Sequence, residues 1–271
     1  MGSISTRKPI LSRAPRNRLI GLFDSGLGGL TVIRRIRERL PDLDLLYFAD
    51  QAHVPYGGRS DEDLFALLQS NLAWLDERGA EAIVMACNTS CAIADLYGWP
   101  PTRAEIFDLL DSATIALQRA QAKRIGVVAT AATVKSGAYG RRIRNAMPQS
   151  EVWEVAAPEL VPLVEAGEFG EAARLAVTAA CMTLPPDLDA VVLGCTHYPV
   201  LEHHFRAALG KGVVLIDPAV VQATRLAEFL ALDETPAGSG TTRYVTSGDP
   251  ERFRVNVARI MEDRSPVVLE Y

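Results

Sequence analysis

Two cysteines follow apolar runs at separate points of the sequence, each where a strand is expected to end and a helix to begin. Cys87 opens the segment CNT after the run AIVMA, and Cys195 opens the segment CTH after the run VVLG. A thiol at a helix start lies near the positive end of the helix dipole, which favours loss of its proton near neutral pH. Two such thiols on opposite sides of one carbon could remove a proton from one face and return a proton to the other. That reaction is racemisation by general acid–base catalysis.

Packing and metal binding are the alternative roles for the cysteines. Free cysteine is among the most buried residue types, and packing is the interpretation for Cys181, inside AARLAVTAACMTL, and for Cys91, four residues after Cys87. A zinc ion would need four ligands, and the candidates are Cys87, Cys91, Cys195 and His197. Their spacing is not typical of a zinc site. We therefore predict neither a metal nor a cofactor, and we expect reduced thiols rather than a disulfide framework.

The glycine-rich loop DSGLGG at 24–29 follows the first apolar run. Glycines after a strand let backbone N–H groups approach an anion, but the loop fits neither the P-loop nor the dinucleotide fingerprint. Asp24 would repel a phosphate and attract an ammonium group. A carboxylate beside amide donors therefore suits an amino acid as ligand, although Asp24 or Ser25 could also act simply as a helix cap.

These candidate residues need a scaffold, and the hydrophobic pattern supplies one. Apolar runs alternate with helical patterns, which predicts an α/β fold of doubly wound parallel sheets with helices on both faces. Such sheets bind ligands at the carboxyl ends of their strands, where the polar and reactive residues of this chain fall. The expected strands are 18–23, 44–49, 82–86, 124–129, 151–155, 189–194, 212–216 and 242–246. The expected helices are 28–40, 61–78, 112–121, 133–146, 168–183, 198–209, 218–232 and 250–263.

The layout around Cys87 is repeated around Cys195: an apolar strand, a cysteine, small polar residues and a helix. Such a repeat predicts two similar α/β lobes, each with one thiol at its strand ends. The lobes would face each other across a cleft, and the cleft would hold the active site.

Composition limits the kind of partner. The chain has 271 residues, 48% of them hydrophobic, and a net charge of −5, which makes nucleic acid an unlikely partner because phosphate binding needs clustered Lys and Arg. No apolar run is long enough to span a bilayer. The basic segment 1–18 lacks the apolar region of a secretory signal, and we read it as a basic tail. A soluble, cytoplasmic protein is expected.

Six segments carry a resemblance to a known family. GLFDSGLGGLTV (21–32), VPYGGRS (54–60), ACNTS (86–90), VKSGAY (134–139), VPLVEAG (161–167) and GCTHYP (194–199) occur in the order seen in glutamate racemases of the aspartate/glutamate racemase family. The resemblance runs from about residue 19 to the C-terminus. It implies a cofactor-independent isomerase that interconverts L- and D-glutamate and supplies D-glutamate for peptidoglycan. A related amino-acid racemase, such as one acting on aspartate, is the alternative.

The resemblance also implies roles for individual residues. Cys87 resembles the thiol that serves D-glutamate and Cys195 the thiol that serves L-glutamate. Asp24 resembles the residue that assists the first thiol, His197 the residue that assists the second, and Glu165 a further assisting carboxylate. Asp24 and His197 are also expected to contact the substrate. The other expected substrate contacts are Ser25, Pro55, Tyr56, Gly57, Asn88, Thr89, Thr130, Thr133 and Thr196.

The resemblance further implies how the chain is divided. A basic extension, 1–18, precedes lobe 1, which is formed by 19–111 together with 217–271 and carries Cys87. Lobe 2 is formed by 112–216 and carries Cys195. A homodimer with a small-molecule substrate, glutamate, is expected. The chain departs from the family pattern at Ser90-Cys91, where family members commonly have alanine and then another small residue.

Overall fold

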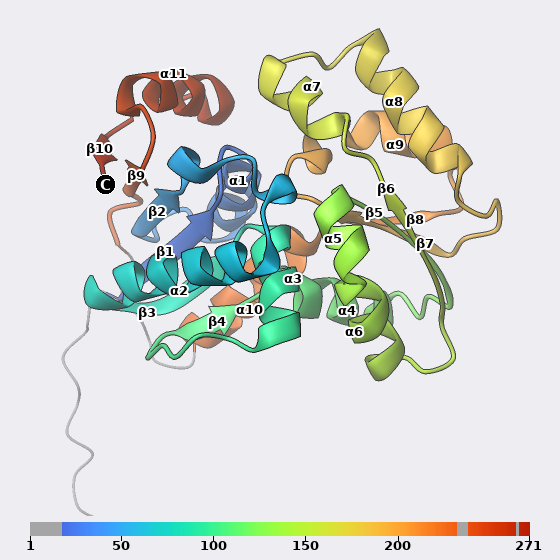
Figure 1. Cartoon of the computed structure of the whole chain (residues 1–271), viewed down its shortest axis with the longest axis horizontal. Coiled ribbons are helices and arrows are strands. Elements are labelled where there is room, and N and C mark those ends of the chain that lie inside the picture. The colour runs from blue at the N-terminus through green and yellow to red at the C-terminus, as the bar shows by residue number, and fades with distance from the viewer. Residues whose placement is uncertain (1–17, 232–237, 264–265) are drawn as a thin grey trace, which may run out of the picture.

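The computed structural model describes residues 18–231, 238–263 and 266–271 (Figure 1). The predicted basic extension therefore lies outside the described residues, apart from Arg18. The strands are β1 (Leu19–Asp24), β2 (Leu45–Ala49), β3 (Ala80–Met85), β4 (Glu105–Phe107), β5 (Arg124–Ala129), β6 (Glu151–Ala156), β7 (Ala190–Gly194), β8 (Val214–Ile216), β9 (Thr242–Thr246) and β10 (Val268–Glu270).

Helices connect nearly all of these strands. The α-helices are α1 (Gly29–Arg39), α2 (Asp61–Glu77), α3 (Asn88–Tyr97), α4 (Leu109–Arg119), α5 (Ala131–Ser136), α6 (Ala138–Ala146), α7 (Leu160–Ala166), α8 (Glu171–Met182), α9 (Glu202–Leu209), α10 (Pro218–Ala231) and α11 (Pro250–Met261). The short 3-10 helices are η1 (Gln51–His53), η2 (Tyr56–Gly58) and η3 (Tyr198–Leu201).

The strands of the described residues form two parallel sheets, which confirms the predicted fold class. One sheet has the order β10-β9-β2-β1-β3-β4 and the other the order β6-β5-β7-β8. The orders β2-β1-β3-β4 and β6-β5-β7-β8 are equivalent. In each set of four strands, the second strand in the chain lies on one side of the first, and the third and fourth lie on the other side. β3 and β7 occupy the same place in their units, so the repeat seen around the two cysteines is a repeat of topology.

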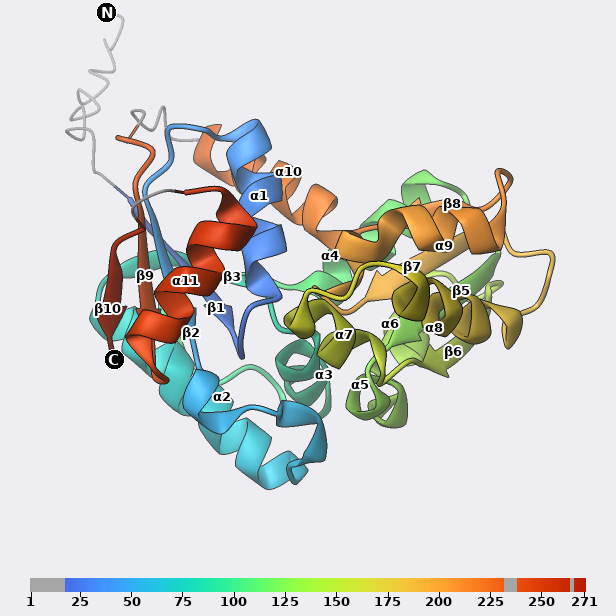
Figure 2. The ribbon, with the colours of Figure 1, turned by 90° about the horizontal axis from the view of Figure 1, so that it is seen from above.

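We call the first sheet with its helices lobe 1 and the second with its helices lobe 2. Figure 2 shows the two lobes side by side along the long axis of the molecule. The C-terminal strands β9 and β10 extend the lobe 1 sheet beside β2. The predicted division of the chain into 19–111 with 217–271 and 112–216 stays a prediction.

Both faces of each sheet are buried, as doubly wound sheets require. In β1, Ile20 and Leu22 pack toward α1, α10 and α11, while Phe23 packs on the opposite face toward α2 and α3. In β7, Val192 packs on the side of α4 and α6, whereas Val191 faces α8 and α9. The strands are apolar along their whole length because helices cover both faces of each sheet. Figure 1 shows these helices on both faces of the lobe 2 sheet.

Four of the α-helices and strands lie outside the predicted ranges, in addition to the short η1 and η2. β4 and β10 have three residues each, too few to give a clear apolar run. α7 contains Pro162, which argues against a helix in a sequence but is tolerated in a first turn. α3 follows Cys87 directly and starts where the repeated layout places a helix.

One predicted helix is two helices in the structure. The range 133–146 is broken at Gly137, which has φ 63° and ends α5 in the left-handed conformation before α6 begins. Glycine adopts this conformation without the steric cost of a Cβ atom. The break changes the direction of the chain just before Tyr139.

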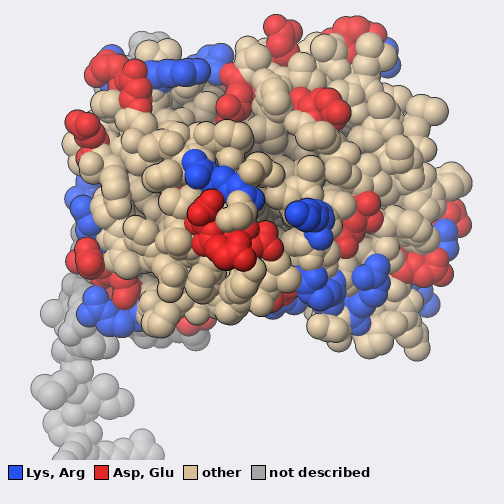
Figure 3. Space-filling model, in the orientation of Figure 1, with Lys and Arg blue, Asp and Glu red and all other residues tan. Residues whose placement is uncertain are grey.

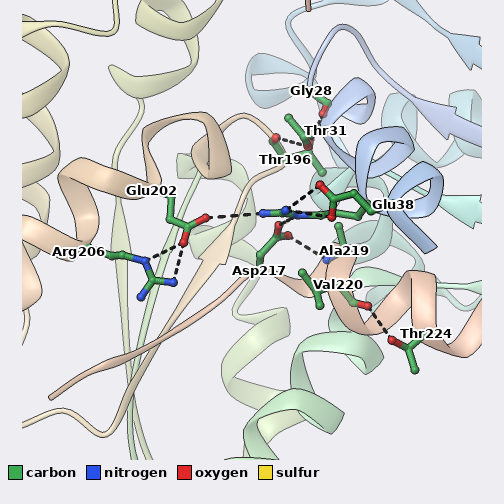
Figure 4. Close-up of polar contacts among 11 residues, drawn as sticks. Gly28, Thr31, Glu38, Thr196, Glu202, Arg206, Asp217, Ala219, Val220 and Thr224 are labelled. Atoms are coloured by element: carbon green, nitrogen blue, oxygen red, sulfur yellow. Dashed lines mark hydrogen bonds and ion pairs between the residues drawn. The ribbon is translucent and has the colours of Figure 1, made fainter. Parts of the chain in front are cut away.

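Polar contacts join the two lobes along α1 (Figure 4). The hydroxyl of Thr31 donates to the carbonyl oxygen of Thr196, at 2.8 Å. One turn further along α1, the guanidinium of Arg35 lies 2.9 Å from the Asp217 carboxylate and 3.7 Å from that of Glu202. Asp217 stands where the chain leaves β8 and returns to lobe 1 through α10.

The surface carries charges of both signs. On the face drawn in Figure 3, described Lys and Arg side chains lie in small groups between groups of Asp and Glu. Within the described residues, no helix is long and apolar enough to cross a membrane.

Candidate active site

A cavity of about 290 Å³ lies between the two lobes, at the carboxyl ends of β1, β3, β5 and β7. This volume is at the small end of the range for ligand pockets, roughly 300 to 1,000 Å³. Every predicted site residue except Thr133 lines the cavity. The lining residues are Asp24, Ser25, Gly26, Val54, Pro55, Tyr56, Gly57, Gly58, Cys87, Asn88, Thr89, Thr130, Ala131, Ala132, Pro158, Val161, Pro162, Glu165, Cys195, Thr196 and His197.

Cys87 faces the cavity from lobe 1, at the N-cap position of α3. Its sulfur lies 3.5 Å from the hydroxyl oxygen of Ser25. Burial, with the negative charge of Asp24, raises the pKa of the Cys87 thiol to about 11. The prediction of a thiol that ionises near neutral pH is therefore wrong for Cys87, because lost hydration outweighs the hydrogen bonds from Ser25 and Ser90 that favour the thiolate.

Asp24 is fixed at the end of β1 by its own glycine-rich loop. The backbone N–H groups of Gly26 and Gly29 donate to its Oδ2 at 3.1 and 2.8 Å, and the hydroxyl of Tyr47 lies 3.2 Å from the same oxygen. Burial raises the pKa of Asp24, although the charge of His197 and the backbone donors oppose that rise. Two of the N–H groups expected to face a substrate anion thus bind the protein's own carboxylate instead.

Cys195 faces the cavity from lobe 2 and begins a chain of three ionisable groups. Its sulfur lies 3.7 Å from Nδ1 of His197, and Nε2 of the same ring lies 3.1 Å from Oε1 of Glu165. Burial alone lowers the pKa of His197, but the hydrogen bonds to Cys195 and Glu165 outweigh it and raise the pKa to about 10. The bond from His197 in turn lowers the pKa of Glu165. His197 is therefore a cation at neutral pH.

Gly28 lets lobe 1 approach this chain of groups closely. A Cβ atom at position 28 would lie 2.6 Å from Nδ1 of His197 and would also overlap the hydroxyl of Thr196. Only glycine fits between α1 and the Cys195 loop without displacing them. The glycine-rich segment predicts a loop at Gly28, but nothing in that segment indicates a contact with the second thiol.

The wall formed by Pro55, Tyr56 and Gly57 is anchored by a buried carboxylate. The hydroxyl of Tyr56 donates to Oδ2 of Asp50 at 2.6 Å, and Oδ1 of Asp50 accepts from Ser247 at 2.7 Å. Burial would raise the pKa of Asp50, but its hydrogen bonds with Tyr56, His53 and Ser247 lower it. Asp50 follows β2 directly, and that position was the available signal for its role.

Four further predicted residues lie at or near helix starts. Thr130 caps α5, and its hydroxyl oxygen lies 2.9 Å from that of Thr133. Thr133 is fully buried behind Thr130 and is not among the lining residues. Asn88 and Thr89 open α3 and line the cavity beside Cys87.

Metal binding has no geometric support among the described residues. Within them, no three His, Cys, Asp or Glu side chains are placed to hold a metal ion. Cys91 and Cys181 are buried and absent from the cavity lining, so their positions agree with packing roles.

The fold and the site define a class of protein: paired α/β lobes with an acid–base cavity between them, suited to moving protons on a small polar substrate. A family model described as Asp/Glu/Hydantoin racemase matches residues 21–226. The chain belongs to this family, which confirms the resemblance seen in its motifs.

Individual relatives are similar over nearly their whole length. A glutamate racemase from Gloeobacter violaceus is 41% identical over 237 residues, covering 87% of this chain and 89% of the relative. A solved glutamate racemase isoform from Bacillus anthracis superposes with a TM-score of 0.85 at 29% identity, covering 94% of this chain and 97% of the other. A glutamate racemase from Francisella tularensis, solved in complex with D-glutamate, gives a TM-score of 0.83 at 27% identity with the same coverage.

Proposed function

We propose that this chain interconverts L-glutamate and D-glutamate by proton transfer between Cα and two thiols. One observation carries the proposal: Cys87 and Cys195 line the same cavity from equivalent positions in two α/β lobes. The similarity to glutamate racemases over most of the chain supports glutamate as the substrate.

Conversion of L-glutamate begins at Cys195. His197 lies 3.7 Å from Cys195, within reach for proton exchange with its sulfur, while the high pKa of Cys87, about 11, keeps that thiol protonated. The Cys195 thiolate takes the Cα proton, the C–H bond breaks, and the electron pair stays on the carbon and its carboxylate. Cys87 then gives its proton to the opposite face, which yields D-glutamate.

The reverse reaction needs the opposite protonation state. Cys87 must be the thiolate when D-glutamate binds, and Cys195 must carry the proton. The ammonium group of the substrate helps here, because a positive charge near Asp24 and Cys87 offsets the burial that raises both pKa values. Asp24 therefore assists Cys87 by holding the ammonium close to it.

Neutral donors hold the substrate carboxylates. Among the described residues that line the cavity there is no Lys or Arg. The remaining hydrogen-bond donors are the amide of Asn88, the backbone N–H groups at the start of α3 and the hydroxyls of Ser25, Thr89, Thr130 and Thr196. Such groups stabilise the negative charge that grows on the carboxylate as the proton leaves.

The test of this function is racemisation in deuterated water. With L-glutamate, the protein should give D-glutamate carrying deuterium at Cα, and L-aspartate should give far less labelled product. Cys87→Ser and Cys195→Ser should each abolish racemisation, because one base cannot serve both faces. Labelling of aspartate instead would keep the reaction and change the substrate, and full activity in either variant would refute the mechanism.

The proposal extends to the setting of the enzyme. We propose that it supplies D-glutamate for peptidoglycan and that it acts in the cytoplasm. We also propose a homodimer, as the family resemblance implies. Size-exclusion chromatography with light scattering tests the oligomeric state.

A further inference from the structure

Tyr139 is a buried residue of lobe 2 to which the reaction assigns no task. It lies near the start of α6, in the segment VKSGAY, and is fully buried. α6 packs beside α3 of lobe 1 (Figure 1). Because α3 begins directly after Cys87, Tyr139 lies where the two lobes meet behind the cavity.

Tyr139 lies between the residues that neighbour the two cysteines in the chain. Its hydroxyl donates to Oδ1 of Asn88 at 2.5 Å, a bond between residues of different lobes. On the other side, a Cβ atom added to Gly194 would lie 3.2 Å from Cε2 of the tyrosine ring. Asn88 follows Cys87 and Gly194 precedes Cys195, so one side chain spans the distance between the two thiol loops.

The hydrogen bond determines what Asn88 presents to the cavity. A side-chain amide has one acceptor oxygen and one donor nitrogen. The hydroxyl of Tyr139 occupies the oxygen, which leaves the nitrogen as the group available to a ligand in the cavity that Asn88 lines. Burial raises the pKa of Tyr139 well above its ordinary value, so the phenol stays a donor.

We propose that Tyr139 is a positioning residue: it holds the Asn88 amide so that its NH₂ group faces a carboxylate of the substrate, and it does so only when the lobes are together. The inference rests on the proposed function. The Tyr139 hydroxyl belongs to lobe 2 and the Asn88 amide to lobe 1. The binding site for the substrate carboxylate is therefore complete only when the two lobes are in contact.

Removing the hydroxyl tests this directly. Tyr139→Phe should raise KM for both glutamate enantiomers by about tenfold, the order expected for one lost orienting hydrogen bond, with a smaller change in kcat. Tyr198→Phe is the matched control: its hydroxyl is also buried and donates to the carbonyl of Ala157 at 2.8 Å, within lobe 2. It should lower the melting temperature by a similar amount while KM stays the same.

A double-mutant cycle separates positioning from packing. If Tyr139 acts through Asn88, Tyr139→Phe should have no further effect on KM once Asn88→Ala is present. If the two substitutions raise KM by factors that multiply in the double variant, the inference is overturned. An unchanged KM in Tyr139→Phe would also overturn it. Partial unfolding does not obscure the result, because KM, unlike kcat, does not depend on the folded fraction.

A further variant keeps the bond between the lobes but removes the donor. Asn88→Asp still offers an oxygen to Tyr139, yet faces the substrate with a carboxylate, so KM should rise more than in Tyr139→Phe. Wild-type KM in Asn88→Asp would show that the bond only fastens the lobes and would overturn the inference. Failure of the wild-type enzyme to racemise glutamate would instead refute the proposed function, so the two failures are distinguishable.

Discussion

At the residue scale, the two thiols differ in their partners. Cys195 has a cationic imidazole at 3.7 Å, while Cys87 has a hydroxyl at 3.5 Å and a buried carboxylate nearby. Racemisation of one compound into its mirror image has an equilibrium constant of one, so kcat/KM must be equal in both directions at every pH. The two half-sites are therefore chemically unlike but must give one common pH profile.

Glu165→Gln tests the role of the imidazole. The Glu165 carboxylate helps to raise the pKa of His197 to about 10, so its removal should lower that pKa. The alkaline limb of the kcat/KM profile should then move to lower pH, in both directions equally. Measuring kcat/KM from pH 6 to 11 checks this, and an alkaline limb that stays in place would show that His197 does not set it.

Reactive residues that lie within short sequence motifs could be predicted from the sequence. Cys87, Cys195 and His197 stand at the ends of apolar runs, where strand ends in a parallel sheet meet. The pKa of Cys87 could not be predicted in the same way, because a helix start favours the thiolate whereas burial, visible only in the fold, opposes it more strongly. Asp50 and Tyr139 act through contacts that are distant along the chain.

At the element scale, the start of α1 joins both halves of the site. The loop before it binds Asp24, Gly28 packs against the Cys195 loop, and Thr31 donates to the carbonyl of Thr196. One loop thus fixes the carboxylate beside the first thiol and the backbone beside the second.

Gly28→Ala should reduce kcat/KM by about a hundredfold, the cost of displacing a catalytic group by roughly 1 Å. The physical reason is overlap of the new methyl group with Thr196 and His197. Gly212→Ala is the control, because a Cβ atom there meets nothing within 4 Å. Steady-state kinetics on both variants decides the matter, and equal activity in the two would show that the contact at Gly28 does not position His197.

Most elements could be predicted from hydrophobic periodicity, and the exceptions have local causes. α7 was missed because of Pro162, and the break between α5 and α6 because Gly137 inside a helical pattern reads as a tolerated interruption. β4 and β10 are too short for a clear signal. Each exception depends on a conformation or a pairing that one segment cannot specify alone.

At the scale of the whole molecule, the ion pair between Arg35 and Asp217 connects α1 to the point where the chain returns from β8 to lobe 1. The Asp217 side chain is 10% exposed and that of Arg35 is 28% exposed. Burial raises the pKa of Asp217, and Arg35 opposes that rise. Loss of the arginine would leave a nearly buried carboxylate without its cation.

Arg35→Met should therefore lower the free energy of unfolding by roughly 1–3 kcal/mol, less than for a fully buried pair because solvent screens the exposed guanidinium. Urea unfolding measures this. Arg174→Met removes an exposed pair with Glu171 and should change the stability little. Equal losses in the two variants would mean that the pair of Arg35 with Asp217 contributes no more to stability than an exposed pair.

The arrangement of the lobes is the part of the structure that the sequence predicts least. The repeat around the cysteines indicates two lobes facing a cleft, but not which side chains meet across it. Contacts such as Thr31 with Thr196 and Tyr139 with Asn88 connect segments far apart in the chain. No periodicity or motif within one segment contains that information.

The early distribution of deuterium distinguishes two thiols on opposite faces of Cα from a single base. L-glutamate is incubated with the enzyme in deuterated water, and both enantiomers are separated and analysed by mass spectrometry before a tenth has reacted. The two-thiol account predicts deuterium in the D-glutamate formed and almost none in the remaining L-glutamate, because the thiol that removes the proton is not the one that supplies the deuteron. Equal labelling of both enantiomers at early times would contradict it, because a single base exchanging with solvent would label both.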